Sequence, residues 1–379
     1  MVYDVAIAGG GAAGLAAAIT AAKRNLRVIV IEAAERVGKK LLATGNGRCN
    51  LASTLPIKNR YNTDEVEATF AKVPLSCILA FFADLGLAVR EEDGRLYPYS
   101  NQASSVLNAL RGGLAEYNAD VLCSAPITKI KEGGKEGRFI LQTSEGGIYA
   151  SNIIFAAGSP AGGGRDSLRL LEAFGHKAKP PVPALVPLLT DITCLRGLKG
   201  VRTEVKASLI ADGKEVKSAK EEILFKDNGV SGTVIFELSS ALARLRDYQR
   251  FNIRLDFAPE YTEGQLDAFV KGKMGAEGLF HKEIAQNIKR YAADKRISFG
   301  RAAKNLVIDV KGPSSFSLAQ VASGGLEIKD FDLSTMESRL RKGLFAAGEA
   351  LDVDGDCGGF NLMWAWASGI LAGNSVYDV

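Results

Sequence analysis

The sequence predicts an α/β fold organised around a parallel sheet, and three features near the N-terminus support this. Residues 2–8 and 27–31 are apolar runs typical of buried parallel strands. The Ala-rich stretch 12–23 between them has the composition of a helix. The spacing G-x-G-x-x-G, beginning at residue 9, joins the first strand to this helix. Together these features are typical of a dinucleotide-binding βαβ unit of the Rossmann kind.

Each glycine of this motif has a separate physical role. Gly9 permits the tight turn from strand to helix, and Gly11 lets a pyrophosphate approach the backbone. Gly14 allows the helix to pack closely against the strand. The helix then directs its unpaired N–H groups, at Ala12 and Ala13 first, and its positive dipole end toward the phosphates.

The acidic residue that such a unit needs stands at the end of the second strand. Glu32 follows the glycine motif at close to the usual interval of about 20 residues, where it would bind an adenosine ribose. A single G-x-G-x-x-G is often only a Gly-rich turn. Here strand, helix, second strand and acid are all in register, so a dinucleotide site is predicted.

Length and composition limit the possible classes of protein. At 379 residues the chain exceeds the roughly 250–300 residues that one hydrophobic core usually serves, so we expect two or three domains. The apolar fraction of 47% and charged fraction of 24% are ordinary for a globular protein. A net charge of +4, spread along the chain, favours a mixed surface and disfavours a nucleic-acid partner.

The cysteines indicate neither a disulfide framework nor a metal site. There are five, widely spaced and without any C-x-x-C, which fits a reducing compartment. Asp4 and the early glycines argue against a signal peptide, and no run of about 18 apolar residues occurs. We therefore expect a cytoplasmic protein without membrane spans or a bound metal.

The segments after Glu32 predict a mixture of elements. Residues 38–50 are too rich in Gly, Asn and basic residues for a regular element and suit an anionic ligand, the alternative being a solvated basic loop. Further on we expect helices within 63–85 and 101–117 and strands near 94–100, 119–123, 126–131, 138–143 and 148–155. The last three strands, with a turn at 133–137, predict an antiparallel meander.

The middle of the chain predicts an insertion of another type. Residues 159–166 form a flexible crossing before a helix that ends near Gly175, and the prolines between 180 and 187 indicate a domain boundary. Residues 186–256 are mainly strands, with a helix at 231–246. Residues 262–304 are helical, and a strand returns at 306–310.

The C-terminal segment predicts a second strand–loop–helix unit. A buried strand ends at Gly348 and Glu349, and a Gly-rich acidic loop leads to a helix at about 360–376. This helix can deliver a second N-terminus to the cofactor and stabilise negative charge on a reduced flavin. We expect Gly358 and Gly359 to allow a close approach that a Cβ would obstruct.

Glu32 is compatible with either NAD or FAD, and if FAD is bound tightly several segments must hold it. One helix N-terminus contributes about 0.3–1 kcal/mol per interaction. Nanomolar retention of a cofactor requires about 12 kcal/mol. The loop 38–50 and both strand ends, near residues 158 and 349, are of the kind that can share this work.

The chain resembles the BaiN/YhiN-like bacterial flavoprotein family of NAD(P)/FAD-dependent oxidoreductases. The resemblance rests on G-K-K-L-L-A-T-G-N-G-R-C-N-L (38–51), P-A-L-V-P-L (183–188), T-M-E-S-R-L (335–340) and the segment 343–369, which contains G-D-C-G-G-F-N-L-M-W-A-W. With the N-terminal motif these segments span nearly the whole chain.

The resemblance implies a Rossmann-like FAD-binding domain built from both chain ends, with an inserted β-rich domain and a small helical domain. The expected boundaries are 1–182 with 316–379 for the FAD domain, 183–256 with 305–315 for the β-rich domain, and 257–304 for the helical domain. The implied FAD contacts are Gly9, Gly11, Gly14, Glu32, Lys39, Lys40, Leu41, Asn50, Glu349, Gly359, Phe360 and Asn361, with the adenine edge near Ile127 in the strand P-I-T-K-I.

Neighbouring positions complete the candidate cofactor site. They belong to the same glycine motif, basic loop, strand ends and acidic loop: Ala12, Ala13, Ala33, Gly38, Gly45, Arg48, Cys49, Ala157, Gly158, Gly348 and Asp356. Cys49 and Cys357 both fall in these loops, but they are far apart in sequence, so we expect no catalytic cysteine pair. The catalytic residue is not assigned, because neither His176 nor His281 has a recognisable catalytic setting.

The predicted function is hydride transfer between FAD and a small organic substrate. The resemblance implies reduction of a conjugated double bond or oxidation of a small amine, and residues 159–166 depart from the family pattern where substrate choice would be made. No second G-x-G-x-x-G follows a strand, so any NAD(P)H would dock transiently at the flavin, or the electrons would come from another donor. The alternatives are an RNA-associated flavoprotein, for which 289–296 is the one basic cluster, and a non-catalytic flavin-binding regulator.

Overall fold

The computed structural model describes residues 2–134 and 138–378, and the chain forms two compact units. The first unit combines residues 1–181 with 321–379, and the second comprises residues 182–320. The first unit therefore draws on both chain ends, as predicted. The expected boundaries of the three domains remain predictions.

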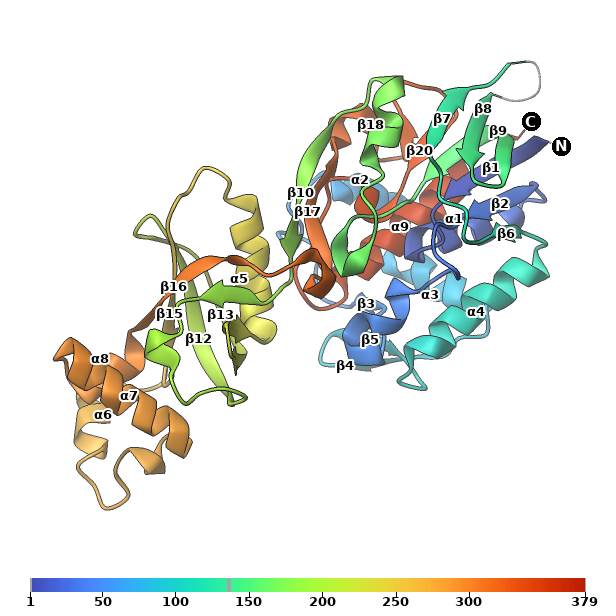
Figure 1. Ribbon diagram of the computed structural model, residues 1–379. Coiled ribbons are helices and arrows are strands. Elements are labelled where there is room, and N and C mark those ends of the chain that lie inside the picture. Colours follow the sequence, from blue (N-terminus) through green and yellow to red (C-terminus); the bar gives the residue numbers. More distant parts are fainter. Residues whose placement is uncertain (1, 135–137, 379) are drawn as a thin grey trace. The chain divides into compact units, whose positions relative to one another are not determined.

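The core of the first unit is a sheet with the strand order β18-β19-β20-β9-β1-β2-β6 (Figure 1). Its strands are β1 (Val2–Ala8), β2 (Val28–Ile31), β6 (Asp120–Leu122), β9 (Gly146–Phe155), β18 (Phe331–Asp332), β19 (Glu337–Ser338) and β20 (Leu344–Ala346). From β20 to β6 all neighbouring strands are parallel. The C-terminal strand β20 thus lies two strands from the N-terminal β1, which explains how both ends build one domain.

The register of this sheet places four strand ends in one row. Ala8 pairs with Ile31 on one side and with Phe155 on the other, and Phe155 pairs with Ala346. Because parallel strands end at the same edge, the loops that follow β1, β2, β9 and β20 are neighbours. In open α/β sheets this edge is where ligands bind.

The predicted antiparallel meander is present. β7 (Lys129–Glu132) pairs with β8 (Phe139–Thr143), and β8 pairs with β9. The predicted turn at 133–137 lies partly outside the described residues. Ile127 precedes β7, so its expected place within a strand was wrong: Thr128 makes the first bond across to Gln142, and the ladder begins at Lys129.

Helices cover the sheet of the first unit. They are α1 (Ala12–Ala22), α2 (Val66–Lys72), α3 (Leu75–Asp84), α4 (Ala103–Glu116) and α9 (Phe360–Ser375). Nearly every residue of α1 is buried, because small Ala side chains let the helix pack on several neighbours at once. A small sheet of β3 (Ala52–Ser53), β5 (Arg95–Pro98) and β4 (Val89–Glu92) completes this unit. The strand β17 (Val321–Leu326) pairs with β10 (Ala178–Ala184).

Two segments differ from the sequence prediction in local conformation. Residues 40–47, expected to be irregular, form 3-10 turns interrupted at Thr44–Asn46, where Gly45 and Asn46 have positive φ. The helix expected before Gly175 is a 3-10 helix (Leu168–Phe174) ended by Gly175 in the left-handed region.

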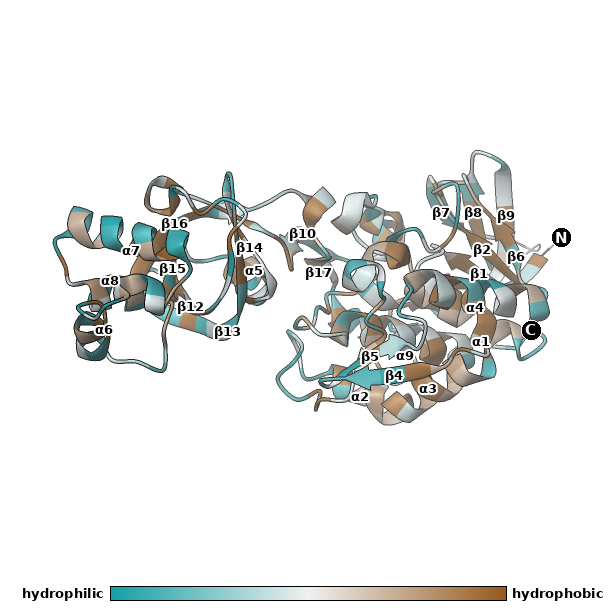
Figure 2. Cartoon of the chain, turned by 90° about the horizontal axis from the view of Figure 1, so that it is seen from below, coloured by the Kyte–Doolittle hydropathy of each residue, from teal (hydrophilic) through white to brown (hydrophobic). Residues whose placement is uncertain are grey.

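The second unit is a closed six-stranded barrel with helices attached. The barrel order is β11-β14-β13-β12-β15-β16, with β11 (Leu188–Thr190), β12 (Arg202–Ala211), β13 (Lys214–Lys226), β14 (Gly229–Ser231), β15 (Phe251–Asp256) and β16 (Leu306–Pro313). Its helices are α5 (Thr233–Arg244), α6 (Glu263–Phe269), α7 (Lys282–Lys295) and α8 (Phe299–Lys304). Figure 2 shows hydrophilic residues along α7, whose other face contributes buried residues such as Ile284 and Ile288.

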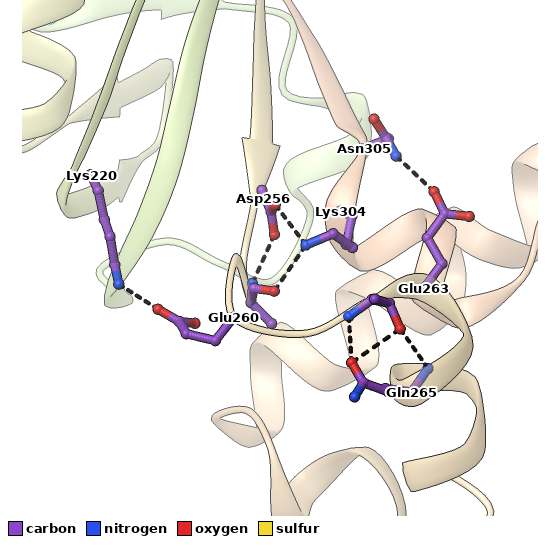
Figure 3. A network of polar contacts seen from close by, with 9 residues as sticks. Lys220, Asp256, Glu260, Glu263, Gln265, Lys304 and Asn305 are labelled. Atoms are coloured by element: carbon purple, nitrogen blue, oxygen red, sulfur yellow. Dashed lines mark hydrogen bonds and ion pairs between the residues drawn. The ribbon is translucent and has the colours of Figure 1, made fainter.

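Polar contacts fix α8 to the barrel and join α6 to the end of α8 (Figure 3). Lys304 Nζ at the end of α8 donates to Asp256 Oδ2 at 2.8 Å, and to the Ala258 carbonyl at 3.0 Å. A capping box between Thr262 and Gln265 starts α6. Asn305 Nδ2, just after α8, donates to Glu263 Oε1 at the start of α6 at 3.3 Å. Lys304 thus holds α8 beside the end of β15, and Asn305 holds α6 beside α8.

No single helix among residues 2–134 and 138–378 is long and apolar enough to cross a membrane. Among these residues, only α2 and α3 taken together have sufficient length and apolar composition, and the two helices are bent by 51° where they join.

Candidate dinucleotide-binding site

The glycine loop after β1 is shaped by three different constraints. Gly9 has φ of 106°, and a Cβ there would lie 2.4 Å from the Ala156 carbonyl oxygen. A Cβ at Gly14 would lie 1.9 Å from the Gly9 oxygen. A Cβ at Gly11 would meet no atom within 4 Å. Gly9 and Gly14 are therefore required by the protein itself, while Gly11 borders open space.

The helix α1 begins at this open space without a cap. Its N-cap residue Gly11 has no side chain, and its first turn has no acidic residue. The N–H groups of Ala12, Ala13 and Gly14 have no acceptor among the described residues. Unpaired N–H groups and a positive dipole end beside open space suit a pyrophosphate.

The end of β2 lies beside the glycine loop, where the adenosine ribose is predicted to bind. Glu32 Oε2 accepts from Gly10 N and Oε1 from Ala34 N, both at 2.7 Å. The carboxylate thus ties the glycine loop to the turn after β2, and each oxygen keeps a lone pair for a ribose hydroxyl. Gly10, which sequence reasoning missed, has Val37 and Glu32 where its Cβ would be. The triple glycine was the available signal.

Ile127 lies on the same side of the site as Glu32. Ala125 N donates to the backbone carbonyl oxygen of Glu32 at 3.0 Å, and Ser124 N donates to that of Ala34 at 2.8 Å. The segment leading to Ile127 therefore runs beside Glu32 and Ala33. The Ile127 backbone has no hydrogen-bond partner among the described residues, so it remains available to a ligand such as adenine.

Lys40 and Glu349 join the basic loop to the end of β20. Lys40 Nζ lies 2.6 Å from Glu349 Oε2. Glu349 Oε1 accepts from Ser159 Oγ and from Ala322 N, each at 2.7 Å. Four distant segments thus meet at one carboxylate. Ser159 lies in the segment 159–166 already singled out in the sequence, whereas Ala322 had no recognisable signal there. Close by, Gly158 after β9 has φ of 71° and open space where its Cβ would be.

Several predicted contact residues have side chains that are already occupied. Leu41, Cys49 and Phe360 are 3%, 0% and 1% exposed, so only their backbone can reach a ligand. Arg48 bonds Glu92 and Asn101, and its guanidinium lies 4.1 Å from the Tyr97 ring centre. Lys39 is exposed.

Three predicted glycines serve packing. A Cβ at Gly38 would lie 2.2 Å from Leu107 Cδ1, and one at Gly348 would lie 2.7 Å from Ala13 Cβ. At Gly45 the nearest atom would be Asn50 N, at 2.9 Å.

Gly359 has a packing role that the sequence did not indicate. Its Cβ would lie 2.5 Å from the Ala52 oxygen, and its φ is 98°. The glycine is therefore required by packing on β3, whether or not the flavin also approaches it, and its role toward the flavin remains a prediction. With the Asn50 amide oriented to satisfy its bonds, Asn50 Oδ1 accepts from Gly359 N at 3.1 Å.

The helix α9 nevertheless presents free N–H groups at its start. Phe360, Asn361 and Leu362 have N–H groups without an acceptor among the described residues, and the first turn holds no acidic residue. Leu362 was not predicted. Asp356, just before this helix, is 6% exposed, and its Oδ2 lies 3.4 Å from Arg60 Nη1.

Close packing of α1 on α9 sets the distance between the two helix starts. Cβ atoms at Gly369 and Gly373 would lie 2.3 Å from the Ala13 oxygen and 2.6 Å from the Ala17 oxygen. Both pairs advance by four residues, so the helices run in the same direction. With a rise of 1.5 Å per residue, α9 starts about 14 Å beyond the point beside Ala13. Two positive helix ends separated in this way suit an extended dinucleotide whose pyrophosphate lies at the start of α1 and whose flavin ring lies at the start of α9.

Comparison with known proteins decides the family. Residues 3–375 match the HI0933-like protein Rossmann domain. The chain belongs to the HI0933-like Rossmann family. It is 31% identical over 411 residues to the 3-dehydro-bile acid delta(4,6)-reductase of Clostridium scindens, covering 99% of each chain. It is 26% identical over 388 residues to the ribosomal RNA dihydrouridine synthase of Haemophilus influenzae, covering 96% of this chain and 95% of that protein.

A solved structure agrees with this family's fold. The 3-ketosteroid-delta4-(5alpha)-dehydrogenase from Rhodococcus jostii is 14% identical, with a TM-score of 0.52 over 100% of this chain and 97% of the other. The predicted family is confirmed, and the chain is an FAD-dependent oxidoreductase with a Rossmann-type cofactor domain. The individual FAD contacts remain predictions.

Proposed function

We propose that this family member reduces a carbon–carbon double bond conjugated with a carbonyl group in a small organic substrate. The observation that carries this proposal is the 31% identity, over 99% of both chains, to a protein named as a delta(4,6)-reductase of 3-dehydro-bile acids. A carbonyl conjugated with the double bond lowers the barrier to hydride addition, because the added charge spreads onto oxygen.

The residues of the first unit suit the cofactor that this reaction needs. Bound FAD would supply the hydride. The open space at Gly11 and the unpaired N–H groups of α1 would hold its pyrophosphate. Glu32 would orient its adenosine ribose, and the N-terminus of α9 would stabilise negative charge at the other end.

We further propose that the electrons come from NADH or NADPH bound transiently. The sequence has no second glycine motif after a strand. A nicotinamide donor would therefore use the substrate side of the same flavin, bind, transfer hydride and leave.

A two-stage spectroscopic experiment tests the proposal. The purified protein is mixed anaerobically with NADH or NADPH, and we expect the visible flavin band to bleach. A steroid with a 4-en-3-one group is then added, and the band should return while the saturated ketone forms. A band that returns with oxygen but with no conjugated ketone would contradict the proposed reaction. Bleaching by small amines would favour oxidation instead.

A second candidate is reduction of uridine in ribosomal RNA. It is favoured by two relatives named as ribosomal RNA dihydrouridine synthases, 26% and 24% identical over at least 95% of each chain. Uracil also contains a double bond conjugated with a carbonyl, so the same flavin chemistry would serve both substrates. Incubating the reduced protein with unmodified ribosomal RNA and measuring dihydrouridine by mass spectrometry distinguishes this candidate from the first.

A further inference from the structure

The loop that precedes α9 is held by a side chain that we had expected to contact the cofactor. Asn361 Oδ1 accepts from Gly355 N at 2.8 Å. Asn361 Nδ2 donates to the Gly355 oxygen at 2.8 Å and to the Asp356 oxygen at 3.4 Å. Both ends of this amide are engaged, so its side chain acts on the loop.

A second asparagine holds the first half of the same loop. Asn62 Oδ1 accepts from Asp354 N at 3.1 Å, and Asn62 Nδ2 donates to the backbone carbonyl oxygen of Asp352 at 3.0 Å. The main chain adds a bond of 3.0 Å from Asn62 N to the Asp354 oxygen. Nothing in the sequence had indicated Asn62.

These two amides sit among acidic groups with little solvent. Asp352, Asp354 and Asp356 are 6%, 1% and 6% exposed. An amide can accept from one backbone group and donate to another, whereas a carboxylate can only accept. At Asn361 an aspartate would keep the shape of the side chain, lose both donated bonds and add a charge beside the acidic loop.

The loop leads directly into the first turn of α9. Tyr61, next to Asn62, bridges to Gly355 and donates from Oη to the Phe360 oxygen at 2.8 Å. Asn361 and the segment of Tyr61 and Asn62 therefore both hold the loop immediately before α9. The unpaired N–H groups of Phe360 and Leu362 lie in the first turn of that helix.

We propose that Asn361 and Asn62 are positioning residues for the flavin end of FAD. They hold residues 352–358 so that the N-terminus of α9 faces the cofactor, and their side chains do not bind it. This inference rests on the FAD site proposed above. It assigns the electrostatic effect of α9 on the flavin to the two amides that fix its first turn.

Asn361→Asp and Asn361→Ala are the test variants, and Asn374→Asp is the matched control. Asn374 is exposed near the other end of α9, so the control adds the same charge far from the loop. Binding of oxidised FAD to each apoprotein is measured by titration, the two-electron potential of each holoprotein is measured, and the melting of each apoprotein is recorded.

We expect Asn361→Asp to weaken binding of oxidised FAD at least tenfold. The variant should weaken binding of reduced FAD by a further factor of ten, because the new carboxylate repels the negative charge that reduced FAD carries at the start of α9. That second factor corresponds to a potential about 30 mV lower. Asn361→Ala should weaken binding with a smaller change in potential, and Asn374→Asp should match the wild type.

The outcomes separate this inference from the function proposed above. A wild-type protein that binds no FAD would refute the cofactor site itself. Wild-type binding together with an Asn361→Asp variant of unchanged affinity and potential would overturn the positioning role. Equal losses for oxidised and reduced FAD, at unchanged potential, would assign Asn361 to folding alone and would also overturn it. If Asn361→Asp does not fold, Asn62→Asp gives the same comparison.

Discussion

Gly11 and Gly14 lie three residues apart but face different surroundings. The backbone at Gly11 is not left-handed, with φ of −83°, and its Cβ direction is open. At Gly14 the same direction ends 1.9 Å from the Gly9 oxygen. Substitution of each by alanine separates the needs of the ligand from those of the fold.

Gly11→Ala should leave the apoprotein stable to within about 1 kcal/mol, the usual range of an N-cap effect. Its methyl group would occupy space needed by the pyrophosphate, so we expect FAD affinity to fall at least tenfold, about 1.4 kcal/mol. Gly14→Ala should instead destabilise the apoprotein by about 1–3 kcal/mol through overpacking. Urea unfolding and FAD titration of both variants check this, and equal stability losses would contradict it.

Cys49 is buried in the first unit, and burial raises the pKa of its thiol to about 12. A cysteine in an unfolded chain titrates near 8.5. As the pH rises, the unfolded chain loses this proton first. The burial therefore contributes stability that is complete below about pH 8.5 and is lost progressively up to about pH 12.

The free energy of unfolding of the wild type should accordingly fall, relative to that of Cys49→Ala, by about 1.4 kcal/mol per pH unit above pH 8.5. Denaturant unfolding of both proteins between about pH 7.5 and 10.5 measures this difference. A difference independent of pH would show that the thiol ionises equally in both states. A thiol held protonated at neutral pH is also a poor nucleophile, which agrees with the expectation that no cysteine pair is catalytic.

The contact between α1 and α9 depends on glycines where α9 meets the backbone of α1. Gly369 leaves no room for a Cβ, whereas Gly112 in the exposed part of α4 has nothing within 4 Å of its Cβ position. These two helical glycines form a matched pair for the same substitution.

Gly369→Ala should destabilise the protein by about 1–3 kcal/mol, because α9 must move away from α1. Since that contact sets the place of the α9 N-terminus, FAD retention should fall as well. Gly112→Ala should stabilise by about 0.5–1 kcal/mol through helix propensity and leave FAD binding unchanged. Thermal melts with and without FAD check both, and a stabilising Gly369→Ala would refute the proposed contact.

The two units have separate hydrophobic cores. One cluster contains the sheet, α1 and α9 of the first unit, and the other contains the barrel and helices α5–α8 of the second. Among residues 2–134 and 138–378, no buried residue is shared between the two clusters. Cooperative unfolding is a property of such cores, so each unit is expected to melt as its own unit.

Calorimetry of the apoprotein should therefore show two transitions. Added FAD should raise only the transition of the first unit, by about 2.7 kcal/mol at a free concentration of 100 times the dissociation constant. Proteolysis during heating identifies which unit melts at which step. A single transition that moves as a whole with FAD would show that the units unfold together.

The features readable from the sequence were those with a local cause. Alternation and apolar runs predicted β1, β2 and the meander, because a buried strand must be apolar along its own length. The glycine spacing and Glu32 predicted the start of α1, since backbone freedom and dipole direction depend on neighbouring residues. The family segments, which span both chain ends, predicted a discontinuous cofactor domain.

Other features depend on residues far apart in the chain and had no local signal. The barrel is closed by antiparallel pairing of β11 with β16, two strands that are more than a hundred residues apart in the chain. No local sequence pattern indicates which distant strand will be the partner. The roles of Asn62 and Asn361 arise because the chain returns to place residues 60–62 beside 352–356. Gly359, Gly369 and Gly11 are all glycines, but their surroundings differ. At Gly359 and Gly369 the backbone of a neighbouring segment leaves no room for a Cβ, whereas at Gly11 the same space is open to a ligand. Sequence spacing does not reveal this difference, because it depends on which segments become neighbours in the fold.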